Sequence, residues 1–183
     1  MRLFVGIPLP EDVTQRLSML AGGIPGARWV APDNYHITLR FLGETDGGQA
    51  EDLIGDLSRL RVAPVPIRID GLGLFGERRR QRMLYADVVA DPGLSHLNQK
   101  IEQIAQRAGY APERRRFHPH ITLARMRNPD RNRLDRYLIE NASLFLPPFA
   151  ADGFTLFESF LGSEGAIYEP IAEFGMVEPV TVV

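Results

Sequence analysis

The stretch Phe-His-Pro-His-Ile-Thr-Leu-Ala-Arg at residues 117–125 has an earlier counterpart, Tyr-His-Ile-Thr-Leu-Arg-Phe-Leu at residues 35–42. Both stretches contain His-Ile-Thr-Leu. Their histidines, His36 and His120, lie 84 positions apart (120 − 36), which is a little under half of the 183 residues. This spacing predicts a chain made of two halves of similar construction.

Each His-Ile-Thr-Leu run is expected to form a β-strand, because β-branched and apolar residues favour strands. Successive side chains of a strand point to opposite faces. In the first copy, His36 and Thr38 would share one face, while Ile37, Leu39 and Phe41 would lie on the buried face. The second copy repeats this pattern, so each strand offers an imidazole beside a hydroxyl.

The residues around the two motifs follow one order: strand, helix, strand, helix, strand. The expected elements cover residues 3–7, 13–21, 35–42, 50–57 and 64–72, then 84–89, 91–108, 117–125, 134–138 and 154–157. We expect one domain over residues 1–183, with duplicated units at about 1–76 and 80–160 and with C-terminal strands in 154–175 completing the sheets. The fold class would be α+β, with two pseudo-twofold-related lobes, antiparallel sheets, helices outside and a groove between the lobes.

Composition restricts the classes of function. The chain has no cysteine, which excludes disulfides, thiolate nucleophiles and sulfur-ligated metals. A net charge of −2 means that any nucleic acid would need a local basic patch. Two arginine clusters, Arg78–Arg82 and Arg114–Arg116, could supply one or could be solvated loops. No apolar run approaches the length of a membrane span, so a cytoplasmic protein without membrane contact is expected.

Several stretches resemble the two-histidine (2H) phosphoesterase superfamily, and within it the bacterial RNA 2′,3′-cyclic phosphodiesterases, also called 2′-5′ RNA ligases. They are the paired His-x-Thr-x motifs, the string at 117–125, Arg-Leu-Phe-Val-Gly-Ile-Pro-Leu-Pro at 2–10 and Gly-Leu-Gly-Leu-Phe-Gly at 71–76. The resemblance covers essentially the whole chain. It implies hydrolysis of the 2′,3′-cyclic phosphate end of an RNA or oligonucleotide to a 2′-phosphate, without metal or cofactor. We separately expect a monomer. Ligation would be the reverse of ring opening.

The resemblance also implies a role for each motif residue. His36 matches the proton donor to the leaving 3′-oxygen, and His120 matches the base toward water. Thr38 and Thr122 would donate hydrogen bonds to the non-bridging phosphate oxygens, and Arg125 matches an arginine that follows the second motif. Imidazole can act as acid or base near neutrality, so the residues alone do not fix which histidine has which role.

Two points about the site stay open. Strict alternation places Arg125 on the face opposite His120, so its reach into the groove requires a twist, a bulge or the end of the strand. Arg40 satisfies the alternation better and is a second candidate. Aromatic residues that could stack on a base or pack in the core are Trp29, Tyr35, Phe75 and Tyr168.

Three alternative functions are compatible with the residues. His36, His118 and His120 could be zinc ligands, although no acidic residue stands near either motif at ligand spacing. The enzyme could act on another cyclic or 2′-5′-linked nucleotide. A non-catalytic RNA-binding module could also have kept the groove, but binding alone would not require two proton-transfer groups.

Overall fold

The computed structural model describes residues 1–76, 81–162 and 165–177. The elements in chain order are β1 (Arg2–Pro8), α1 (Glu11–Ser18), β2 (Arg28–Trp29), the 3-10 helix η1 (Pro32–Asn34), β3 (His36–Glu44), α2 (Gly47–Ser58), β4 (Val65–Ile67), β5 (Ile69–Phe75), β6 (Gln81–Val88), α3 (Pro92–Arg107), β7 (His120–Arg127), α4 (Arg131–Glu140), β8 (Phe149–Ala151), β9 (Gly153–Leu161) and β10 (Ala166–Gly175). Both motifs lie at the start of a strand, and the expected α+β class is confirmed.

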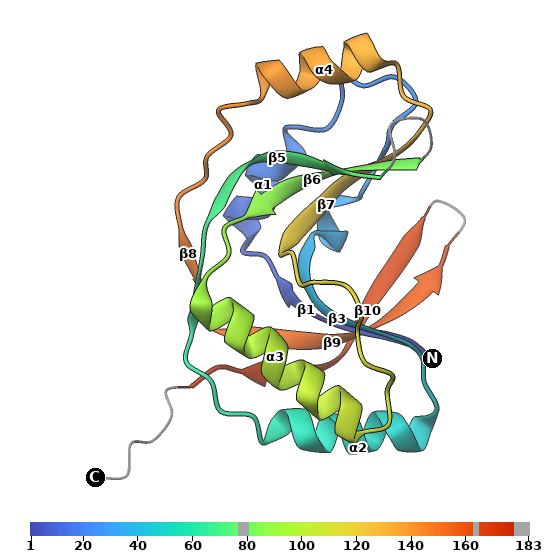
Figure 1. The fold of residues 1–183 in the computed structure, drawn as a ribbon, viewed down its shortest axis with the longest axis vertical. Coiled ribbons are helices and arrows are strands. Elements are labelled where there is room, and N and C mark those ends of the chain that lie inside the picture. Colours follow the sequence, from blue (N-terminus) through green and yellow to red (C-terminus); the bar gives the residue numbers. More distant parts are fainter. Residues whose placement is uncertain (77–80, 163–164, 178–183) are drawn as a thin grey trace.

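The main sheet is antiparallel and runs in the order β10-β9-β1-β3-β7-β6-β5, with β2 paired to β7; β4 and β8 form a separate two-stranded sheet. The two motif strands, β3 and β7, pair only at Ile37 and Ile121. Figure 1 shows β5, β6 and β7 in the upper half of the view and β1, β3 and β9 in the lower half. The two lobes are therefore half-sheets of one sheet, and they meet at the centre of the two motifs.

Helix α3 belongs to the second half of the chain but packs on the first half-sheet. The Asn98 side chain of α3 donates to the Leu39 carbonyl of β3 at 2.8 Å. At the C-terminal end of α3, the Ala108 carbonyl accepts from the Gln49 side chain of α2 at 3.0 Å. Figure 1 shows α2 and α3 together at the bottom of the view. A helix from the second half of the sequence thus covers β3 and packs against a helix from the first half, so the halves interlock.

Helix boundaries follow local capping. Asp91 caps α3 and accepts the Gly93 amide at 2.7 Å. Helix α2 begins at Gly47, three residues before the expected start at residue 50, because Asp46 accepts the Gln49 amide at 2.8 Å. Helix α1 ends earlier than predicted, at Ser18.

One predicted strand, residues 64–72, is divided. Residues Val65–Ile67 pair with β8, whereas Ile69–Phe75 pair with β6. The carbonyl of the intervening Arg68 accepts the Val89 amide at 2.8 Å.

Among the described residues, none of the helices has the length and apolar character needed to cross a bilayer.

Candidate active site

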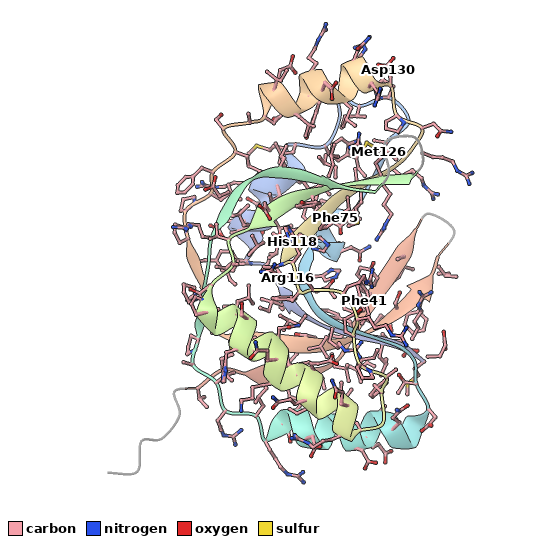
Figure 2. The ribbon with its side chains drawn as sticks, in the orientation of Figure 1. Phe41, Phe75, Arg116, His118, Met126 and Asp130 are labelled. Carbon is pink, nitrogen blue, oxygen red and sulfur yellow. The ribbon has the colours of Figure 1, made fainter. Side chains whose placement is uncertain are left out.

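A cavity of about 1360 Å³ lies beside the junction of the two half-sheets. All five predicted site residues line it: His36, Thr38, His120, Thr122 and Arg125. Figure 2 shows Phe41, Phe75, Arg116 and His118, which also line the cavity, in the central region between the upper and lower half-sheets. The structure therefore brings the two motifs to one site, as the sequence predicted.

A β-bulge on β7 explains how Arg125 reaches the cavity. Thr122 pairs with Tyr85 and Ala124 pairs with Leu84, so Leu123 is an extra residue on β7. Such a residue reverses the alternation of all side chains that follow it. Arg125 consequently lies on the cavity side with Thr122 and is exposed.

The same bulge occurs on β3. Thr38 pairs with Gly6 and Arg40 pairs with Val5, which leaves Leu39 as the extra residue. Phe41 therefore occupies the place on β3 that Arg125 occupies on β7, five residues after the histidine. Its side chain is 53% exposed, so the expectation that Phe41 is buried was wrong.

Arg40 is only 8% exposed and is engaged elsewhere. Its guanidinium donates to Glu102 and to the carbonyls of Phe41 and Ala111. These bonds attach β3 to α3 and to the segment after it. Arg40 is at the cavity wall, but these partners make it a poor candidate for substrate binding.

The His36 imidazole is fixed by one hydrogen bond at each nitrogen. Nδ1 donates to the Asn34 carbonyl at 2.7 Å, and Nε2 lies 3.0 Å from the Thr38 hydroxyl, which then donates to it. The ring also packs against Phe4 at 4.8 Å and Tyr168 at 5.2 Å between centroids. Burial lowers the pKa of His36 from 6.5 to about 4, helped by the nearby charges of His120 and Arg125 and opposed by the bond to Asn34.

His120 has the equivalent hydrogen bond at Nδ1. Its Nδ1 lies 2.7 Å from the His118 carbonyl, to which it donates, so the neutral ring presents an unprotonated Nε2. Burial has the largest effect on the pKa of His120 and lowers it. The bond to the His118 carbonyl and the charge of Asp87 raise this pKa, whereas the His118 imidazole and Arg125 lower it. In both halves, a carbonyl two residues before the histidine selects the same tautomer.

The hydrogen-bond donors around the two imidazoles have weak or internal acceptors. Thr122 Oγ1 lies 3.4 Å from the Met83 sulfur, and Arg125 Nη1 lies 3.5 Å from the same atom. A thioether is a weak acceptor, and the Thr38 hydroxyl bonds to the imidazole beside it. These groups can turn toward an anion without breaking a strong bond.

Further cations surround the cavity. Arg28 on β2 is paired directly with Arg125 and is exposed. Arg115 and Arg116 also line the cavity, and Arg115 contacts Glu113 at 3.5 Å. Residues Arg78–Arg80 of the other predicted arginine cluster, Arg78–Arg82, lie outside the described residues.

Three of the four aromatic candidates, Trp29, Phe75 and Tyr168, line the cavity, whereas Tyr35 is 4% exposed and belongs to the core. Strand alternation explains this difference, since Tyr35 and Ile37 point to the same side of the sheet. Sequence reasoning missed Arg28, Phe41 and Asp87. Superposing the two motifs would have found Phe41, but Arg28 and Asp87 depend on strand pairing.

The zinc alternative gains no support from the geometry. Within residues 1–76, 81–162 and 165–177, no three His, Cys, Asp or Glu side chains converge in a way that could hold a metal ion. His118 instead contacts Asp87, with 3.1 Å between Nε2 and Oδ1.

The sequence profile of the family described as LigT like Phosphoesterase matches residues 7–85 and again residues 88–168. A Bacillus subtilis protein named RNA 2′,3′-cyclic phosphodiesterase is 35% identical over 127 residues, covering 67% of this chain and 69% of its own. One of the same name from Aeropyrum pernix is 32% identical over 161 residues, covering 86% and 90%.

Solved structures, two of them of LigT, are also similar to this chain over nearly its whole length. A Thermus thermophilus protein superposes with a TM-score of 0.81 at 27% identity, covering 96% of this chain and 98% of its own. Escherichia coli LigT in its apo form superposes with a TM-score of 0.76 at 27% identity, covering 97% and 98%. LigT has also been solved with 3′-AMP, again with a TM-score of 0.76, 27% identity and coverage of 97% and 98%.

Proposed function

The chain belongs to the LigT-like phosphoesterase family, and on that premise we propose that it hydrolyses the 2′,3′-cyclic phosphate end of RNA or of an oligonucleotide to a 2′-phosphate. The names of its relatives and the 3′-AMP complex of LigT support this substrate class. The observation that supports it most directly is the pairing of Ile37 with Ile121. Because of this pairing, the two imidazoles and two hydroxyls line one cavity, and we propose that the phosphate binds between them.

In the proposed mechanism, His120 Nε2 removes a proton from water as the water attacks phosphorus. The 3′-oxygen leaves from the opposite side and receives a proton from His36 Nε2. The bond to the 2′-oxygen stays intact, so the product carries a 2′-phosphate. Each step requires that the reacting nitrogen be Nε2, which fits the Nδ1–carbonyl bonds of both rings.

A donor role for His36 requires that it take up a proton on binding substrate. Its pKa of about 4 makes the imidazole neutral in the free protein at pH 7. An anionic phosphate placed beside the ring favours the charged imidazole and raises its pKa. Substrate binding would therefore be accompanied by proton uptake at His36.

Thr38, Thr122 and Arg125 are proposed to hold the non-bridging oxygens, on which negative charge must be stabilised during the reaction. The leaving oxygen belongs to the ribose, so the ribose and its attached nucleobase would lie toward His36. Tyr168, whose ring is 5.2 Å from the His36 ring, would then be close to the nucleobase. Ligation would use the same groove, with an RNA 5′-hydroxyl attacking in place of water.

The test is turnover of a short RNA ending in a 2′,3′-cyclic phosphate, in the presence of chelator. We expect the wild type to form the 2′-phosphate and His36→Ala and His120→Ala each to lose at least about 100-fold in rate, the usual contribution of a general acid or base. His96→Ala is the matched control, because His96 is an exposed residue of α3 outside the cavity.

Each alternative gives a different result in the same assay. Activity that disappears with chelator would indicate a metal enzyme. RNA binding without turnover would indicate a binding module, and turnover only of other cyclic or 2′-5′-linked nucleotides would change the substrate. We also propose that the active form is a cytoplasmic monomer, which light scattering and cell fractionation would test.

A further inference from the structure

Two side chains outside the proposed catalytic set, Asp87 and His118, contact each other beside His120. His118 Nε2 lies 3.1 Å from Asp87 Oδ1, and the two side chains are 47% exposed for His118 and 42% exposed for Asp87. Asp87 is on β6, where the strand register places it directly opposite His120 on β7. His118 lines the cavity, and the pair lies next to the imidazole proposed as the base.

The main chain connects His118 to His120 as well. The His118 carbonyl accepts the Nδ1 proton of His120 at 2.7 Å. Pro119 lies between them and disfavours a helical conformation of His118. The His118 ring also packs edge-on against Phe75 at 5.2 Å and Tyr85 at 5.5 Å. Asp87 and two aromatic rings thus fix the residue whose carbonyl orients His120.

We propose that Asp87 and His118 act as a positioning pair for His120, in which Asp87 anchors the His118 side chain and the His118 carbonyl orients the His120 imidazole. The inference rests on the proposed function, because it assigns the pair to the base of that reaction. Neither residue needs to touch the reacting atoms.

The other half of the protein has an uncharged version of this arrangement. The Asn34 carbonyl accepts Nδ1 of His36, and the Asn34 side chain donates to the Ala166 carbonyl at 2.7 Å. Both imidazoles are therefore oriented by the residue two positions earlier, whose side chain is anchored elsewhere. Only the anchor beside His120 carries charge, so only this pair can act on the imidazole electrostatically.

The charges of the pair have opposite effects on His120. The titratable and charged groups that face its ring are His118 before β7, Asp87 and Tyr85 on β6, Arg125 on β7 and His36 on β3. Burial has the largest effect and lowers the pKa of His120, while His118 lowers it further and Asp87 raises it. Loss of Asp87 should therefore lower this pKa, and loss of the His118 imidazole should raise it.

The test compares Asp87→Asn, His118→Gln and the double variant with the wild type. NMR titration of labelled His120 and the pH dependence of kcat/KM are both measured. We expect the His120 inflection to move down in Asp87→Asn and up in His118→Gln. The rings are 6.2 Å apart, and a unit charge at that distance in water corresponds to roughly half a pH unit. The double variant should titrate between the two single variants.

Asp135→Asn is the control, because it removes the same charge from an exposed position on α4. Its inflection should match that of the wild type. The proposal would be overturned if the His120 inflections of both single variants moved in the same direction. It would also be overturned if the single variants had lower rates but kept the wild-type inflections. If the wild type turns over no cyclic phosphate, the proposed function fails, but the NMR titration still decides whether the pair acts on His120.

Discussion

Acid should destabilise this protein through His36. Its ring is buried against Phe4 and Tyr168, and burial lowers its pKa to about 4. In the unfolded chain, the same imidazole titrates near its ordinary value of about 6.5. Between these two values, the unfolded state binds a proton that the folded state does not bind. The free energy of unfolding must therefore fall as the pH falls from about 6.5 to about 4.

The size of this effect follows from the two pKa values. One pH unit of difference corresponds to about 1.4 kcal/mol, so the full contribution of His36 is about 3 kcal/mol. This contribution is present above pH 6.5 and is lost below pH 4. Most single domains are stable by only about 5–15 kcal/mol, so the loss should be easily measured.

Urea unfolding at pH 7.5 and pH 4.5 provides the assay, with wild type, His36→Gln and His96→Gln. Glutamine does not titrate, so His36→Gln should lose roughly 2.5 kcal/mol less stability than the wild type between the two pH values. The comparison uses the change with pH, so a general destabilisation of the variant does not affect it. The exposed His96 serves as the control. If His36→Gln loses as much stability as the wild type, the burial argument is refuted.

Three further predictions concern activity and packing. Burial lowers the pKa of both His36 and His120, so both inflections of kcat/KM against pH should lie below about 6.5; a profile centred above pH 7 would contradict this. Arg125→Gln should lower kcat/KM by about tenfold or more, the value of a hydrogen bond to a charged group, and unchanged kinetics would exclude it from substrate binding. Gly6→Ala should cost about 1–3 kcal/mol in urea unfolding, because its Cβ would lie 3.1 Å from the Ile37 carbonyl and 3.3 Å from His36; a wild-type midpoint would show that the strands can separate.

The sequence predicted the strands, the helices and the convergence of the two motifs because these depend on local periodicity and on a repeated pattern. It could not choose between Arg40 and Arg125. Strict alternation favoured Arg40, but the bulges at Leu39 and Leu123 turn each arginine to the other side of its strand. A bulge is a property of the pairing of two strands, and the sequence of one strand does not indicate it.

Residues that depend on a partner strand were missed for the same reason. Arg28 enters the site because β2 occupies the edge of β7 that β3 leaves free beyond Ile121. Helix α3 and β3 likewise come from different halves and are joined by Arg40 and Glu102. We propose that residues 1–183 form a single domain derived from a duplication, since helices of one half cover strands of the other.

The two halves of the site differ around their histidines. The proposed reaction adds water on one side of phosphorus and releases the ribose oxygen on the other, so the two imidazoles have different tasks. The strand position that pairs with the motif threonine is Gly6 in one half and Tyr85 in the other. Glycine lets the His36 ring pack closely, whereas Tyr85 stands beside His120 and crosses Gly73, where any Cβ would lie 2.2 Å from its ring. The proposed duplication supplies one imidazole from each half, and their surroundings differ: His36 lies among aromatic rings, whereas His120 lies beside the charged pair of Asp87 and His118. In the proposed mechanism, His36 is therefore the imidazole that depends on the bound phosphate anion to take up its proton.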